Sequence, residues 1–294
     1  MLHQRYQEAE AVLRESLSLH GDGASEPRYP ASDARLPLSL MASVRGDFAV
    51  AVSHGEAALR LSLESGHALN ERIAHYALAR AAIGQGQFLQ GETHARDAFA
   101  ACELAGDRWF MADCHLELGD AARGLGRHVE AERHYATALD ICREFGNQGG
   151  MAEALNRRAD LALSQLDYAE AHQLFLSSLA FCEAVSERRE IARAECGLGD
   201  TLSGLEEPGA AAVHYRRALR LAERMRWWPL VLRVADGTFA LVSSADGPKR
   251  ARELLTALGL SMELSETSRR KSAPVDMPRV VTELEIALLA FDSP

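Results

Sequence analysis

MAEALNRRADLALSQLDYAEAHQLFLSSLAFCEAVS, residues 151–186, is the clearest copy of a phrase that recurs every forty residues along this chain. The positions equivalent to Tyr168 are Phe48, Phe88, His128 and Pro208, and those equivalent to Ala171 are Ala51, Gly91, Ala131 and Ala211. The positions equivalent to Ser178 are all alanine, at Ala58, Ala98, Ala138 and Ala218. Five copies follow one another without an insertion, which predicts a chain of stacked repeats.

Within each copy we expect a first helix, a tight turn and a second helix that packs back against the first. Glycines mark the turns, as in Gly84-Gln85-Gly86, because glycine readily adopts the left-handed conformation that ends a helix. Small residues such as Ala171 let the two helices approach closely, and the aromatic at Phe175 or its equivalents fills the groove beside them. The predicted fold class is therefore an all-α, right-handed α-solenoid of antiparallel helix hairpins.

The same frame predicts the order of the segments. Pro37 falls inside the first helix of the first repeat and should shorten it. The C-terminal segment carries apolar residues at helical spacing, so we expect it to cap the open end of the stack. The predicted segments are a lone helix with a Gly/Pro loop (1–31), five regular repeats (32–231), a degenerate sixth repeat (232–260), a polar linker (261–277) and a C-terminal capping helix (278–294).

The composition argues against several classes of function. The 294 residues carry a formal net charge of −10, whereas nucleic-acid binding relies on clustered Lys and Arg, so we expect no direct nucleic-acid binding. No apolar run approaches the roughly 18 residues that span a bilayer, and the N-terminus lacks a signal-peptide core, so we expect a cytoplasmic protein. No phosphate-binding loop, GxSxG or HExxH motif is found, so we expect neither an enzyme nor a bound cofactor.

One column of histidines invites a metal interpretation. The shared position holds His54, His94, His134 and His214, with Leu174 in the fourth copy. Equivalent positions of stacked repeats should lie roughly 8–10 Å apart, too far for ligands that surround one zinc ion at about 2.1 Å. We therefore predict no metal site and interpret the column as packing, with a pH-sensitive packing role as the alternative.

The spacing Gly119…Ala131…Tyr135…Ala138, repeated as Gly199…Ala211…Tyr215…Ala218, resembles the tetratricopeptide repeat (TPR). The first tryptophan of the TPR pattern is absent, and the forty-residue period resembles a long-helix subclass. The stretch GNQGGMAEALNRRADLALSQLDYAEAHQLF, residues 146–175, is similar to the TPR sensor arms of bacterial STAND-type regulators. The long repeat also resembles those of peptide-sensing Rap-like receptors and of spindle-orientation scaffolds. The resemblance covers residues 32–260 and implies a binding scaffold.

In TPR proteins the first helices line an inner groove, and the resemblance implies ligand contacts at fixed positions along them. Carried onto this chain, the polar and aromatic contacts are Tyr76, Arg80, Asp113, Asp120, Arg123, Glu153, Asn156, Asp160, Arg193 and Asp200. Asn156 matches the asparagine with which many TPRs hold a peptide backbone. The aspartates Asp120, Asp160 and Asp200 would form an acidic row that favours a cationic peptide or helix. The alternative is that these aspartates pair with arginines such as Arg123 or Arg193 on neighbouring first helices.

A second candidate interface is the cluster Arg226, Trp227 and Trp228, because Trp and Arg are enriched at interface hot spots. The alternative is that these tryptophans fill gaps at the end of the solenoid. The leading hypothesis for function is a non-catalytic scaffold that binds a protein or peptide, as the sensor or interaction arm of a bacterial signalling or transcription regulator. The alternatives are a small-molecule or signal-peptide receptor that encloses its ligand, and a structural module that forms homo-oligomers.

Overall fold

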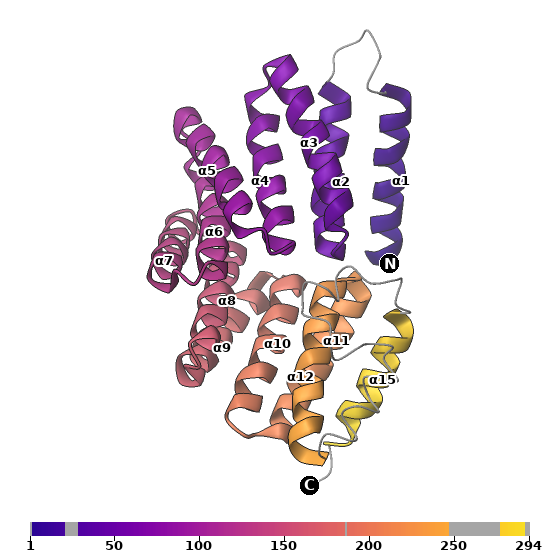
Figure 1. Cartoon of the computed structure of the whole chain (residues 1–294), viewed down its shortest axis with the longest axis vertical. Coiled ribbons are helices and arrows are strands. Elements are labelled where there is room, and N and C mark those ends of the chain that lie inside the picture. The colour runs from indigo at the N-terminus through magenta and orange to yellow at the C-terminus, as the bar shows by residue number, and fades with distance from the viewer. Residues whose placement is uncertain (1, 21–28, 186, 247–276, 292–294) are drawn as a thin grey trace. The chain divides into compact units, whose positions relative to one another are not determined.

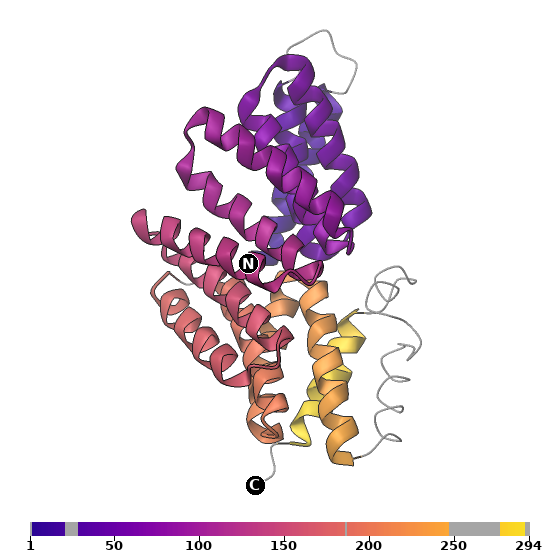
Figure 2. The same cartoon turned by 60° about the vertical axis from the view of Figure 1, so that its left-hand side comes forward.

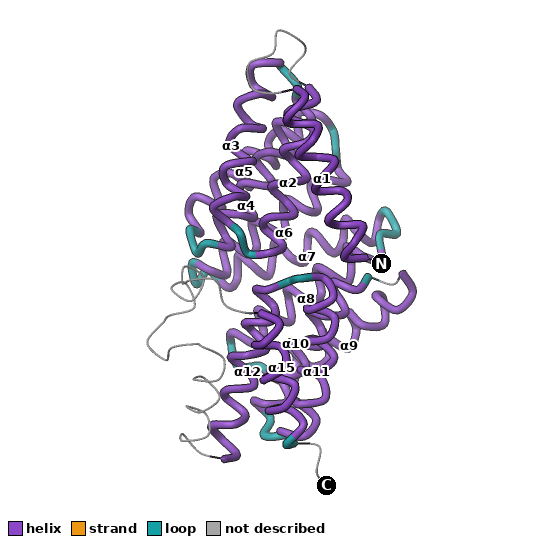
Figure 3. Tube along the Cα trace, turned by 90° about the vertical axis from the view of Figure 1, so that its right-hand side faces the viewer, coloured by secondary structure: helices purple, strands orange, loops and turns teal. Residues whose placement is uncertain are grey.

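The computed structural model describes residues 2–20, 29–185, 187–246 and 277–291, and these ranges are almost entirely helical. Their thirteen helices are labelled in Figure 1, and no strand occurs in these ranges (Figure 3). This confirms the predicted all-α fold class. Within the described ranges, no helix is both long and apolar enough to cross a membrane.

The helices fall into two compact units. The first unit contains α1 (Leu2–His20), α2 (Tyr29–Arg45), α3 (Phe48–Ser65), α4 (Ala68–Gly84), α5 (Phe88–Ala105), α6 (Arg108–Gly124) and α7 (His128–Glu144). The second contains α8 (Gln148–Ser164), α9 (Tyr168–Val185), α10 (Arg188–Gly204), α11 (Pro208–Met225), α12 (Trp228–Asp246) and α15 (Met277–Leu289). Inside each unit every helix packs on the next, and successive first helices pack on each other, as α4 does on α6 and α10 on α12. This is the packing of an α-solenoid.

Glycines opposite aromatic rings explain how closely the helices pack. Gly119 lies against the ring of Tyr135 in the same hairpin, and a Cβ at that glycine would overlap the ring. Other glycines accept a ring from the preceding repeat, as Gly84 does for Phe48 and Gly204 does for Tyr168. The aromatic residues that begin second helices, Phe48, Phe88 and Tyr168, therefore pack between repeats rather than within one.

The turns inside the hairpins need a backbone that L-residues seldom adopt. Gly86 and Gly126 have φ values of 78° and 74° at these turns. At the same position of the fourth and fifth repeats, Leu166 and Glu206 both have a φ of 62°. A side chain in this left-handed region costs roughly 1–2 kcal/mol, so the later turns are strained where the earlier ones are not.

Helix α2 corrects one expectation from the sequence. We expected Pro37 to shorten the first helix of the first repeat, but α2 runs unbroken from Tyr29 to Arg45 with Pro37 inside it. Tertiary contacts support the helix on both sides of the proline, because Ser39 donates a hydrogen bond to the Ala51 carbonyl and Asp33 accepts one from Asn70. Packing thus outweighs the local preference of proline.

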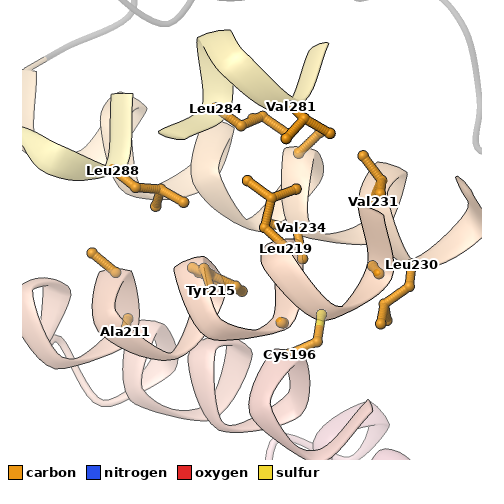
Figure 4. Packing of buried hydrophobic residues seen from close by; sticks show 14 of the residues in the cluster. Cys196, Ala211, Tyr215, Leu219, Leu230, Val231, Val234, Val281, Leu284 and Leu288 are labelled. Carbon is orange, nitrogen blue, oxygen red and sulfur yellow. The ribbon is translucent and has the colours of Figure 1, made fainter. Parts of the chain in front are cut away.

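Among the described residues, the largest hydrophobic cluster lies at the end of the second unit, where α15 packs on α11 and α12. Leu284 and Leu288 of α15 are fully buried, and they pack with Tyr215 and Leu219 of α11 and Val234 of α12 (Figure 4). Figure 2 shows α15 beside α12, as their contacts require. Residues 261–276 of the predicted linker 261–277 lie outside the described residues, as does the part of the predicted sixth repeat that follows Asp246. The last residue assigned to the linker, Met277, is the first residue of α15.

Candidate partner-binding surface

The residues predicted to contact a partner all lie on first helices, but they belong to different units. The first unit holds Tyr76, Arg80, Asp113, Asp120 and Arg123 on α4 and α6. The second holds Glu153, Asn156, Asp160, Arg193 and Asp200 on α8 and α10. Each group is therefore considered within its own unit. We call the half-exposed members of each group the first-helix face of that unit: Tyr76, Arg80, Asp113 and Arg123 in the first unit, and Glu153, Arg193 and Asp200 in the second.

In the first unit, Arg80 and Tyr76 of this face contact each other. Arg80 Nη1 donates a hydrogen bond of 2.7 Å to the Tyr76 hydroxyl, and its guanidinium carbon lies 5.5 Å from the centre of that ring. Arg80 also lies 3.8 Å from a carboxylate oxygen of Glu117. Tyr76 in turn packs edge-on against Phe110, with 5.2 Å between ring centres. These contacts hold both side chains in place while leaving them partly exposed.

Asp120 has a structural partner within its own hairpin. The Tyr135 hydroxyl donates a hydrogen bond of 2.7 Å to Asp120 Oδ1, and Arg123 lies 3.8 Å from the same oxygen. The Asp120 side chain is buried. Asp120 therefore helps to join the two helices of the third hairpin, whereas the alternative predicted from the sequence places its partner on a neighbouring first helix.

In the second unit, the acidic row is bound to arginines. Arg193 donates two hydrogen bonds, of 3.0 and 2.7 Å, to Asp160 Oδ2. Arg233 bridges two repeats, with Nη2 lying 2.9 Å from Asp160 and 2.7 Å from Asp200. Asp200 also accepts a hydrogen bond of 2.7 Å from the Tyr215 hydroxyl. Two carboxylates and two guanidinium groups thus form one charge-balanced network.

Sequence reasoning missed Arg233, although a signal for it exists. Arg193 and Arg233 occupy the same position of successive repeats, and each lies 33 residues after the aspartate that it contacts. Desolvation would lower the pKa of Arg233, but the carboxylates of Asp160 and Asp200 outweigh this effect and raise that pKa well above its usual value. Burial, followed by the charge of Asp200, raises the pKa of Tyr215. Both groups therefore keep their protons and act as fixed donors.

Asn156 does not present its amide to solvent. The side chain is fully buried, and its Nδ2 donates to the Glu190 carbonyl oxygen at 3.0 Å and to Glu190 Oε2 at 2.9 Å. Burial, and then the charge of Glu153, raises the pKa of the Glu190 carboxyl. Glu153 itself accepts a 2.5 Å hydrogen bond from Arg157. The residue that resembles a peptide-gripping asparagine thus joins α8 to α10.

The second candidate interface combines an exposed arginine with two half-buried tryptophans. Arg226 is exposed and ends α11 with a left-handed φ of 53°, at a position where the first three hairpins have glycine. Trp227 and Trp228 pack against the terminal core, and the guanidinium of Arg189 lies 5.0 Å from the centre of the Trp227 ring. Most of this cluster therefore fills space, and its exposed edges are the part open to a partner.

The histidine column has partners on the first helices that the sequence interpretation overlooked. His94 Nδ1 lies 3.1 Å from His75 Nδ1, and His134 Nδ1 lies 3.0 Å from His115 Nδ1. In the fifth repeat His214 lies 2.6 Å from Glu195. Burial, followed by the charge on the neighbouring ring, lowers the pKa of His94, and the same causes lower that of His115 to about 4. The sequence does contain a sign of this pairing, because His75 and His115 each lie 19 residues before the histidine that they contact.

Comparisons with known proteins agree with the repeat fold. A family model described as tetratricopeptide repeat matches residues 110–184 and 150–224. The apo form of RapI is similar in structure, with a TM-score of 0.62 and 13% identity over 86% of this chain and 91% of RapI. A Rap protein complexed with Competence and Sporulation Factor has a TM-score of 0.63 and 14% identity over 89% of this chain and 75% of that one. Such low identities show the fold alone. No curated protein matches the sequence significantly.

Proposed function

We propose that this chain, whose residues 110–224 match the tetratricopeptide repeat model, is a non-catalytic scaffold that binds a protein or peptide through the first-helix faces of its two units. In this proposal it serves as the sensor or interaction arm of a bacterial signalling or transcription regulator and works in the cytoplasm. The repeat fold supports a binding role because stacked hairpins present side chains from successive helices along one surface.

The observation that carries the proposal is the set of fixed, partly exposed donors on the first helices. Arg80 is held by Tyr76 and Glu117, and Arg193 is held by Asp160. The side chains of Arg80 and Arg193 are each 15% exposed. Because these contacts fix the guanidinium groups in advance, a partner that binds there loses less side-chain freedom on association.

The charge balance in the second unit refines the expected partner. A cationic partner was predicted because stacked carboxylates attract opposite charge. Asp160 and Asp200 already share Arg193 and Arg233, so this network offers no net negative charge. We therefore propose a partner that accepts hydrogen bonds from the arginines, such as a peptide backbone or carboxylate. A captured partner that is cationic would instead support the original expectation.

A signal-peptide receptor is the second candidate. The observation that favours it is the likeness to a Rap protein solved with Competence and Sporulation Factor, which spans 89% of this chain. A short peptide would then bind without a larger protein partner.

Oligomerisation through the N-terminal helix α1 stays a third hypothesis. Light scattering on a variant without residues 1–30 tests it.

The proposal is tested by capturing partners from the native cytosol and measuring their affinity for purified variants. Arg80→Ala and Arg193→Ala remove one donor from each unit's first-helix face, while Asp160 keeps Arg233 as a partner. The matched controls are Arg143→Ala and Arg217→Ala on second helices, whose side chains are 60% and 59% exposed. We expect a loss of about tenfold or more for at least one first-helix variant, as for interface hot spots, and less than about twofold for the controls.

Two outcomes would count against the proposal. One is a partner whose affinity falls in the control variants and not in the first-helix variants. The other is a partner bound equally well by all four, which would place the interface elsewhere. A synthetic peptide cut from the captured partner separates the two candidates, because a signal-peptide receptor binds the short peptide as tightly as the whole partner.

A further inference from the structure

We propose that His75, His94 and Asp97 form a binding site for one divalent transition-metal ion, with Zn²⁺ as the best fit, that links α4 to α5. The three side chains each offer one ligand atom, and these atoms lie within 4.8 Å of one another. Two imidazole nitrogens and one carboxylate oxygen are ligands that zinc accepts readily. The proposal is independent of the partner-binding role.

The distances between the ligand atoms are close to those of a zinc site. Zinc–nitrogen bonds of about 2.0–2.1 Å at tetrahedral angles place two ligand nitrogens roughly 3.3 Å apart. His75 Nδ1 and His94 Nδ1 lie 3.1 Å apart. Asp97 Oδ2 lies 3.7 Å from His75 Nδ1, so a small side-chain adjustment brings the carboxylate into range. The ring centres lie 5.4 Å apart, so the two nitrogens point at each other as in a hydrogen bond, and both rings must tilt to share one ion.

The fold positions these ligands without help from a loop. His94 and Asp97 are three residues apart on α5 and therefore share a helix face. His75 projects from α4, which packs directly on α5. Sites on packed helices hold their ligands more precisely than sites on loops.

An ion can reach this site from solvent. The Asp97 side chain is 51% exposed, whereas that of His75 is 15% exposed. His94 also lines a groove of about 510 Å³ that is bordered by Glu56 of α3 and Leu78 of α4. The remaining coordination position would be taken by water, as in zinc sites with three protein ligands.

The next hairpin provides an internal comparison. His115 and His134 show nearly the same pairing, at 3.0 Å, but the position equivalent to Asp97 is Thr137. Glu130 approaches the other nitrogen of His134, with Nε2 lying 3.9 Å away, so it does not complete a group around the Nδ1 pair. Among the described residues, only the second hairpin brings together three such ligands. The histidine pair of the third hairpin thus forms only a hydrogen bond, and Asp97 is what distinguishes the proposed metal site of the second hairpin from it.

Zinc binding is measured by competition with a chromophoric chelator, with Co²⁺ absorption as a second probe of tetrahedral coordination. We expect one zinc equivalent for the wild-type chain, and its loss in the double variant His75→Leu/His94→Leu. Leucine should be tolerated, because Leu155 and Leu174 occupy the same positions in the fourth repeat. Asp97→Thr, which makes this hairpin match the next one, should weaken binding by at least the roughly tenfold seen when an outer-shell partner of a metal ligand is lost.

Two further variants make the test decisive. His115→Leu/His134→Leu is the matched control and should leave the zinc equivalent unchanged. Thr137→Asp supplies the third hairpin with the missing carboxylate and should add a second zinc equivalent. Far-UV circular dichroism confirms that each variant is folded. The proposal is overturned if zinc binding survives His75→Leu/His94→Leu or if the control loses the ion equally, since either result places zinc among the other histidines of the chain. It is also overturned if Asp97→Thr has no effect, since Asp97 is then not a ligand.

Discussion

At the scale of single residues, the hairpins depend on positions where glycine is needed, either because a side chain would overlap a ring or because the backbone is left-handed. Glycine removes the overlap that a Cβ would make with a ring, as at Gly119 beside Tyr135. Elsewhere glycine allows a left-handed backbone without strain, as at Gly126, which has a φ of 74°. A Cβ there would meet no atom within 4 Å, so only this φ disfavours a side chain. Leu166 occupies the equivalent turn of the next repeat with a φ of 62°. The two turns therefore differ in backbone strain rather than in packing.

Leu166→Gly should stabilise the protein. The side chain is 68% exposed, so its removal costs little packing, while relief of the left-handed strain gains roughly 1–2 kcal/mol. The extra conformational entropy of glycine in the unfolded chain offsets about 0.5–1 kcal/mol of this gain. We expect a net gain of about 0.5–1 kcal/mol in the free energy of unfolding, measured by urea denaturation.

Gly126→Ala is the control for this prediction and should destabilise the protein by about 1 kcal/mol, because alanine there incurs the strain without any clash. If Leu166→Gly lowers the unfolding midpoint, the strain assigned to this turn is wrong.

At the scale of helices, side-chain pairs join the two helices of a hairpin, and their chemistry changes from repeat to repeat. The positions of His115 and His134 are taken by leucines in the fourth repeat and by Glu195 and His214 in the fifth. The neighbouring groups around the His115 pair include Glu130, Arg133 and Arg96. Burial, followed by the charges of His134 and Arg133, lowers the pKa of His115 to about 4. This hairpin therefore folds with neutral rings.

The pair makes stability depend on pH in a definite direction. A histidine whose pKa falls on folding binds protons more readily when unfolded, so its contribution to stability is complete above its unfolded pKa of about 6.5 and is lost as the pH falls toward 4. Replacing both rings, as in His115→Leu/His134→Leu, should reduce the slope of unfolding free energy against pH in this window. Urea denaturation at a series of pH values measures the slope.

The control for the pH prediction is Ser39→Ala, which removes the buried hydrogen bond to the Ala51 carbonyl and no titratable group. This variant should lower stability while leaving the slope of unfolding free energy against pH unchanged, because serine does not titrate. An unaltered slope in His115→Leu/His134→Leu would show that the rings are already neutral to the same extent in the unfolded chain.

At the scale of the whole molecule, the sequence period was sufficient to predict the helices and their pairing into hairpins. It predicted less about the candidate surface, because a column gives the position of a residue and not its partner. Asp160 was placed on a first helix correctly, but only the structure shows that Arg233 of a later repeat shares it. Asn156 likewise matched a binding motif by position, whereas its amide is used by Glu190. Such contacts depend on which neighbouring side chain is long enough to reach.

The terminal helix α15 should be needed for the stability of the second unit. Leu284 is fully buried in the core that α15 forms with α11 and α12. Leu284→Ala removes buried methyl groups and leaves a cavity, so we expect a loss of about 2–5 kcal/mol in unfolding free energy. Ile286→Ala on the same helix is the control, because that side chain is 59% exposed and its loss should cost less than about 0.5 kcal/mol.

Thermal and urea denaturation of the two variants distinguish a capping helix from a loosely attached one. Equal stability of Leu284→Ala and Ile286→Ala would mean that α15 adds nothing to the fold of the second unit.

The spacing of 33 residues between each aspartate and its arginine has a consequence for how such a chain can evolve. Asp160 and Asp200 each find an arginine at this spacing, and the period of the chain is forty residues. An in-frame duplication of residues 193–232 would supply every aspartate with an arginine again, and a deletion of the same segment would place Arg233 at the right spacing from Asp160. Such a chain can therefore gain or lose this whole repeat without leaving one of these aspartates unpaired.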